Sequence, residues 1–102
     1  MNWNSSENKA FVQALLALRN PDETRRFLRD LLTENEIKEF ATRLQAATLL
    51  SDNVPYSTIE KKTGMSSTTI ARVSKWLNGN EGGYRSVIGK IHHHSPSLAR
   101  GR

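Results

Sequence analysis

The chain has 102 residues, of which 36% are hydrophobic and 25% charged, a composition typical of one soluble folded domain. It has no cysteine, which excludes disulfide bonds and thiolate metal sites, and no apolar run of the roughly 20 residues that a membrane-spanning helix needs. The polar start of the chain lacks the basic and apolar regions of a signal peptide, so we expect a cytoplasmic protein.

The net charge of +5 is unevenly distributed along the chain. Residues 1–55 carry seven basic and eight acidic side chains, whereas residues 56–102 carry eight basic side chains and two acidic ones, Glu60 and Glu81. A concentration of positive charge favours a polyanionic partner such as nucleic acid, although a merely solubilising basic surface would have the same composition. We therefore expect a scaffold in the first half and an interaction surface in the second.

The first half predicts three helices. Phe11, Leu15 and Leu18 at i, i+4, i+7 spacing indicate a helix over about residues 6–18. Asn20 followed by Pro21 is typical of a helix start, and the second helix is expected to bury Phe27, Leu28, Leu31 and Leu32.

A capping box, Thr33-Glu34-Asn35-Glu36, opens a long third helix that should end near residues 51–53, before Pro55. Its apolar stripe comprises Ile37, Phe40, Ala41, Leu44, Ala47 and Thr48.

The second half predicts three shorter helices. Ser57-Thr58-Ile59-Glu60 has the form of a second capping box, opening a helix that stops at Gly64. The next helix starts at Ser66 or Ser67, turns Ile70, Val73 and Leu77 inward, and ends at Asn78-Gly79. A last helix runs from Tyr84 to about His92. We expect residues 1–94 to form one all-α domain and residues 95–102 a disordered basic tail.

Two short helices joined across a turn that holds Gly64 predict a helix-turn-helix over about residues 57–77. Ile59 should then pack on Ile70 and Val73, and Met65 should fill the corner. Gly64 would take the positive φ that a steep crossing needs. A second helix held in this way presents its N-terminal residues to the major groove of DNA.

The outward side chains of this unit suit DNA contacts. Small hydroxyl residues at the helix start can approach base edges, Ala71 can touch a thymine methyl group, and basic side chains suit phosphates. A plain helical hairpin in another all-α domain is the alternative, and Glu60 stands where a helix-turn-helix usually has a small residue. The candidate DNA-binding residues are Ser57, Lys61, Lys62, Ser66, Ser67, Thr68, Thr69, Ala71, Arg72 and Lys75.

The segment Leu31–Leu77 resembles the Trp repressor family, and most of all its Trp-repressor-related regulators of the YerC/YecD type. The resemblance extends over about residues 7–92, and the loop with Leu77-Asn78-Gly79 and Gly82-Gly83-Tyr84 also looks like that subfamily. The densest matches are Thr33-Glu34-Asn35-Glu36-Ile37, Thr42-Arg43-Leu44, Ile59-Glu60, Thr63-Gly64 and Thr69-Ile70-Ala71-Arg72-Val73.

The resemblance implies a Trp-repressor-like intertwined homodimer in which the N-terminal helices of each chain pack against the partner. Two recognition helices would then lie about one DNA turn, ~34 Å, apart and bind a palindromic operator. The implied function is a sequence-specific transcription regulator, with repression as the expected sign. Base reading would fall to Ser67, Thr68, Thr69 and Ala71.

The resemblance also implies a possible effector pocket. In the Trp repressor, tryptophan lies between two arginines near a threonine, and Thr33, Arg43 and Arg72 match those positions. The repressor has a glycine where this chain has Val73 and a serine where it has Trp76. We therefore predict that L-tryptophan is not a corepressor here and expect no other cofactor. The alternative role of Arg43 and Arg72 is pairing with acids or phosphates.

Other classes of function have weaker support. The sequence has no glycine-rich phosphate loop, nucleophile elbow or HExxH motif, so we do not expect an enzyme. His92, His93 and His94 would point about 100° apart on a helix and could not converge on a metal. Trp3 and Trp76 could stack on bases or lie at a dimer contact. A non-enzymatic helical protein-interaction module, whose basic face meets an acidic partner, is the alternative function.

Overall fold

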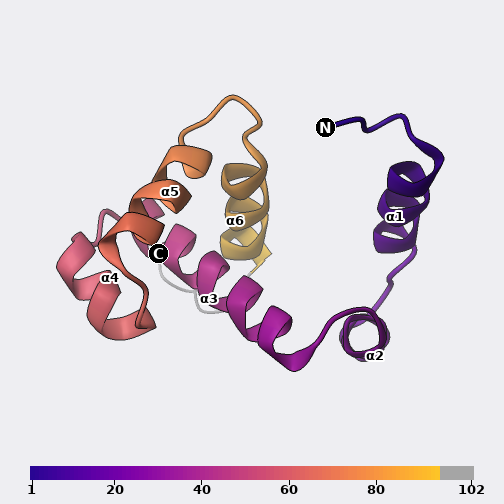
Figure 1. The fold of residues 1–102 in the computed structure, drawn as a ribbon, viewed down its shortest axis with the longest axis horizontal. Coiled ribbons are helices and arrows are strands. Elements are labelled where there is room, and N and C mark those ends of the chain that lie inside the picture. The colour runs from indigo at the N-terminus through magenta and orange to yellow at the C-terminus, as the bar shows by residue number, and fades with distance from the viewer. Residues whose placement is uncertain (95–102) are drawn as a thin grey trace. The chain divides into compact units, whose positions relative to one another are not determined.

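The computed structural model describes residues 1–94, which form six α-helices and no strand (Figure 1). This confirms the all-α prediction, and the predicted tail over residues 95–102 lies outside the described residues. No helix in the described part is both long and apolar enough to cross a bilayer. The helices are α1 (Ser6–Leu16), α2 (Pro21–Leu31), α3 (Glu34–Ser51), α4 (Tyr56–Thr63), α5 (Ser67–Leu77) and α6 (Gly83–His94).

The predicted starts of α2 and α3 are confirmed by their capping hydrogen bonds. The Asn20 side chain accepts from the Glu23 N–H at 2.8 Å, and Pro21 occupies the first turn of α2. The Thr33 hydroxyl accepts from the Glu36 N–H at 3.1 Å, while the Thr33 N–H donates to the Glu36 carboxylate at 2.9 Å. Both partners of this capping box are therefore satisfied, as its sequence predicts.

The predicted capping box at Ser57 is wrong. Helix α4 begins at Tyr56 after Pro55, and its first turn has no side-chain cap hydrogen bond. The ring of Pro55 fixes φ at −63° with an extended ψ of 150°, so the helix can begin directly after it. Ser57 lies inside the helix and cannot take the extended conformation that an N-cap residue needs.

The chain divides into two compact units, residues 1–37 and the residues from 38 onward. The second unit contains the core, to which α3, α4, α5 and α6 all contribute, and α5 contacts both α4 and α6 (Figure 1). The predicted inward side chains of α5 are confirmed. The buried apolar residues are Ala46, Ala47, Ile59, Ile70, Val73, Leu77 and Ile88.

The first unit has no buried side chain in α1 or α2. Phe11 is 46% exposed and Leu16 is 74% exposed. The prediction that α2 buries its apolar side chains is wrong for the single chain, because Leu31 is 46% exposed and Phe27 and Leu28 are half-buried. Two short helices cannot surround a core, so their apolar faces stay at the surface.

The apolar stripe predicted for α3 is also only partly buried. Ala47 lies in the core, whereas Phe40 is 44% exposed and Leu44 is exposed as well. Ala46, which lies outside the predicted stripe, is fully buried. The fully buried positions of α3 are thus two alanines, while Leu49 and Leu50 near its end pack partly buried against the core and Phe40 and Leu44 are left at the surface.

Candidate nucleic-acid interface

The turn between α4 and α5 is built around Gly64, which has the predicted positive φ, +76°. Its N–H donates to the Glu60 carbonyl at 2.9 Å and closes α4. The Thr63 hydroxyl donates to the Ile59 carbonyl at 2.7 Å and accepts from the Met65 N–H at 3.1 Å. Because glycine takes a positive φ without steric cost, this turn fixes the direction in which the chain enters α5.

The packing of α5 against α4 follows the prediction. Ile59 of α4 and Ile70 and Val73 of α5 are fully buried members of one core cluster. Met65, in the corner between the helices, is half-buried and packs against that cluster. The inner side of α5 is therefore fixed to the core, and its N-terminal end is left at the surface.

The hydroxyl groups at the start of α5 fall into two kinds. Ser66 caps the helix, accepting from the Thr69 N–H at 3.2 Å, and the two hydroxyl oxygens lie 3.0 Å apart. Ser67 and Thr68 are exposed, and their side chains have no hydrogen-bond partner among residues 1–94. Ser67 and Thr68 can thus offer their hydroxyl groups to a ligand, whereas Ser66 and Thr69 use theirs on each other.

The basic candidates surround this helix start. Lys61 and Lys62 lie in the last turn of α4, Arg72 and Lys75 lie on α5, and all four are exposed. The ion pairs found within the described part of the chain all involve residues 19–26, so these four side chains have no acidic partner there. Ser57 and Ala71 are exposed as well. The structure thus places the ten predicted DNA-binding residues on one helix pair, while their roles remain predictions.

Of the three predicted effector residues, Thr33 and Arg43 have roles within the chain, and Arg72 is exposed. Thr33 belongs to the first unit, where it caps α3, and Arg43 and Arg72 belong to the second. The Arg43 guanidinium lies over the rings of Phe40 and Trp76, at 5.4 and 5.9 Å from their centroids. Arg43 therefore packs on aromatic rings, whereas pairing with an acid was the alternative considered. A shared effector pocket stays a prediction.

The last turn of α5 has a hydrogen bond to α6 and a neighbouring pocket that no local sequence pattern predicts. The Arg85 side chain of α6 donates to the Leu77 carbonyl at 2.5 Å. Burial raises the pKa of the Tyr84 phenol above its ordinary value near 10, and the positive charge of Arg43 offsets part of that rise. A pocket of about 760 Å³ lies at this end of α5. Its lining residues are Leu44, Lys75, Trp76, Gly79, Asn80, Glu81, Gly83, Tyr84 and Val87.

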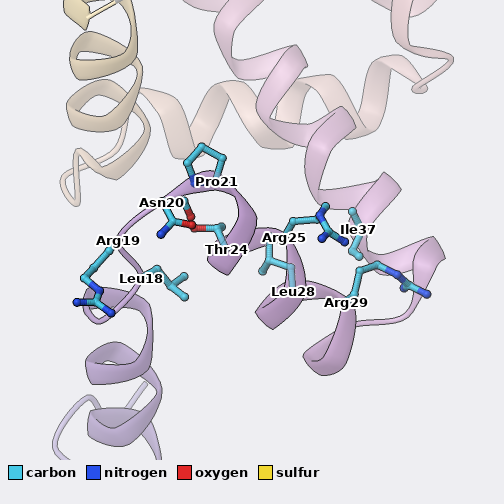
Figure 2. Close-up of a pocket in the computed structure, with 9 residues that line it drawn as sticks. All are labelled: Leu18, Arg19, Asn20, Pro21, Thr24, Arg25, Leu28, Arg29 and Ile37. Carbon is cyan, nitrogen blue, oxygen red and sulfur yellow. The ribbon is translucent and has the colours of Figure 1, made fainter.

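A second pocket, of about 630 Å³, lies within the first unit, and Figure 2 shows its lining residues coming from the segment that joins α1 to α2, from α2 and from the start of α3. Two of its arginines already pair with acids, since Arg19 lies 3.9 Å from Glu23 and Arg25 lies 2.8 Å from Asp22. This pocket is therefore mainly an apolar hollow. Its lining residues are Leu18, Arg19, Asn20, Pro21, Thr24, Arg25, Leu28, Arg29 and Ile37.

The fixed inner side of α5 and its exposed polar start define the class of the protein, a helix-turn-helix protein. The family model of the Trp repressor protein matches residues 6–92, and the chain belongs to this family of DNA-binding regulators. It is 37% identical to the uncharacterized protein YerC of Bacillus subtilis over 78 residues, 76% of this chain and 75% of YerC.

Among solved structures, the chain matches the crystal structure of a TrpR-like protein from Eubacterium eligens with a TM-score of 0.81 and 36% identity. The match covers 87% of this chain and 92% of that one. Together these comparisons confirm the resemblance that was based on residues 31–77, and they confirm the Trp-repressor-like fold.

Proposed function

We propose that the protein is a sequence-specific DNA-binding transcription regulator that acts as a repressor, with α5 as its recognition helix. One observation carries this proposal. Ile59, Ile70 and Val73 fix the inner side of α5 to the core, while Ser67 and Thr68 stand exposed at its start with no partner among the described residues. A rigidly held helix with a free polar N-terminus is what major-groove reading requires.

The roles of the individual side chains follow from their chemistry. Ser67 and Thr68 offer hydroxyl groups to base edges, and Ala71 and the Thr69 methyl group suit a thymine methyl. Lys61, Lys62, Arg72 and Lys75 contact phosphates and set the position of the protein on DNA. The exposed Ser57 can add a phosphate contact, and Ser66 contributes by capping α5. Membership of the Trp repressor family supports this assignment.

The functional unit in this proposal is an intertwined homodimer. Apolar surface exposed on α1 and α2 supports it, because such surface on a soluble chain marks an interaction site. The first unit also has an apolar hollow, and Phe40 and Leu44 are exposed on the part of α3 that belongs to the second unit, so both units have apolar surface for a partner chain. A C2 dimer would place two α5 helices about one DNA turn, ~34 Å, apart and bind a palindromic operator.

A double substitution tests the proposal against the alternative of a protein-interaction module with a basic face. Thr68→Ala with Thr69→Ala should remove the preference for the operator over a scrambled duplex in a fluorescence anisotropy titration at physiological salt. The matched variant, Lys61→Glu with Lys62→Glu, should weaken binding to both duplexes equally, because phosphate contacts carry no sequence information. Equal affinity of the unmodified protein for both duplexes, abolished by moderate salt, would favour the interaction module.

A further inference from the structure

Two arginines from different helices meet the last turn of α5, whose final residues are Trp76 and Leu77. Arg43 of α3 lies over the Trp76 ring at 5.9 Å, and Arg85 of α6 donates to the Leu77 carbonyl at 2.5 Å. The C-terminal end of α5 is thus attached to both neighbouring helices by directional polar contacts, in addition to the apolar packing along its inner side.

We propose that Arg43 is a positioning residue for DNA reading, because its stacking on Trp76 attaches α3 to the end of α5 and sets the angle at which the start of α5 meets DNA. This inference rests on the proposed function. It assigns Arg43 a role within the chain itself, and it requires no small molecule between α3 and α5.

The apolar packing of α5 does not by itself fix this angle. Ile70, Val73 and Leu77 hold one side of the helix against the core, and burial of apolar surface is not directional. Trp76 is nine residues beyond Ser67, about 13 Å along the helix axis, so a small tilt at Trp76 displaces the reading residues. Trp76 is 47% exposed and is not a member of the core, so its contact with Arg43 is an additional constraint.

Arg43 is held in a defined place by more than one ring. Its guanidinium also lies over Phe40, three residues earlier on α3, at 5.4 Å. Its charge acts on Tyr84 of α6 as well, where it lowers the pKa that burial raises. A planar guanidinium stacks well on aromatic faces, and a lysine ammonium lacks this geometry. The contacts therefore depend on arginine in particular and not on positive charge alone.

The test compares Arg43→Gln with Lys38→Gln, a control that removes the same charge from an exposed position on the same helix. Operator affinity of Arg43→Gln should be about two- to fivefold weaker than that of the control, the range expected for losing the one cation–π contact, with Trp76, that joins α3 to α5. Affinity for a scrambled duplex should be the same in both variants, because Arg43 positions the reading residues and does not contact phosphate. Arg43→Lys should recover only part of the loss.

Two further comparisons separate positioning from folding. In a Trp3→Phe background, which leaves Trp76 as the remaining tryptophan, Arg43→Gln should change the fluorescence emission maximum of the free protein, and Lys38→Gln should not. Trp76→Phe keeps an aromatic ring for Arg43 and Trp76→Leu does not, so Trp76→Phe should bind the operator more tightly. This comparison tests the positioning role even if Arg43→Gln lowers the melting temperature.

Equal operator affinity of Arg43→Gln and Lys38→Gln, in a protein that prefers its operator, would overturn the positioning role alone. If the unmodified protein showed no operator preference, the proposed function and the positioning role would both be overturned.

Discussion

The hydroxyl oxygens of Ser66 and Thr69 lie 3.0 Å apart, and the Thr69 N–H donates to the same Ser66 oxygen at 3.2 Å. This pair closes the first turn of α5 and occupies two of the four hydroxyl groups at the start of that helix. The neighbouring Ser67 and Thr68 are left exposed. Within this short segment, the outer pair of hydroxyl groups stabilises the helix start and the inner pair is left for DNA.

The capping role of Ser66 predicts a stability difference between adjacent serines. Ser66→Ala should lower the free energy of unfolding by about 1 kcal/mol, because the first turn of α5 loses its cap. Ser67→Ala, the matched control, should change it by less than about 0.5 kcal/mol, as is usual for surface positions. Urea denaturation followed by circular dichroism measures both. Equal effects of the two substitutions would contradict the assignment.

Replacing Gly64 should lower the free energy of unfolding through backbone conformation alone. A Cβ added at this position would meet no atom within 4 Å, so a larger residue fits, but φ is +76°. Gly64→Ala should therefore destabilise the protein by about 1 to 2 kcal/mol through left-handed backbone strain. Gly64→Asn should cost less, because asparagine tolerates this region better. A crystal structure of Gly64→Ala should show the turn unchanged, and a shifted α5 would contradict this explanation.

The Arg43 contacts predict that L-tryptophan does not act as an effector. The Arg43 guanidinium already lies over Phe40 and Trp76, and Val73, which stands where the repressor has a glycine, is fully buried. One of the two arginines that resemble the repressor's ligand site is thus engaged within the chain. L-Tryptophan and D-tryptophan should produce the same melting temperature in a thermal shift assay, because a ligand stabilises only a state that it binds. A saturable rise with the L-isomer alone would show that the site accepts it.

The exposed apolar face of α1 predicts dimerisation. Phe11→Asp should reduce the mass measured by light scattering from two chains to one, because a buried unpaired charge at a dimer contact is costly. Gln13→Asp adds the same charge to an exposed polar position on the same helix and serves as the control. If Phe11→Asp kept the mass of two chains, this face of α1 would not be part of the interface.

Local signals in the sequence predicted local structure well. The caps at Asn20 and Thr33 depend on residues within one helical turn, and both form as predicted. The start of α5, predicted at Ser66 or Ser67, is capped by Ser66. The cap predicted at Ser57 does not form, because Pro55 is the last extended residue and α4 begins directly after it.

Features that depend on distant partners could not be predicted in the same way. Periodicity identified the apolar residues Leu31 and Phe40, but it does not state which surface covers them, and in the single chain both are exposed. Arg43 and Trp76 are separated by 33 positions, so no local pattern reveals their contact. Among the four hydroxyl residues at the start of α5, the sequence does not show which are free. The contact between Ser66 and Thr69 in the structure shows that these two are engaged.

Selection of binding sites from a random duplex library, at physiological salt with excess nonspecific DNA, tests the central claim most directly. A dimeric regulator that reads DNA through α5 should enrich one palindrome whose half-sites are centred about one helical turn, roughly 10 base pairs, apart. Loss of that enrichment in the Thr68→Ala variant would link it to α5. Recovery of unrelated sequences, with binding that moderate salt abolishes, would contradict the claim that this protein reads DNA sequence.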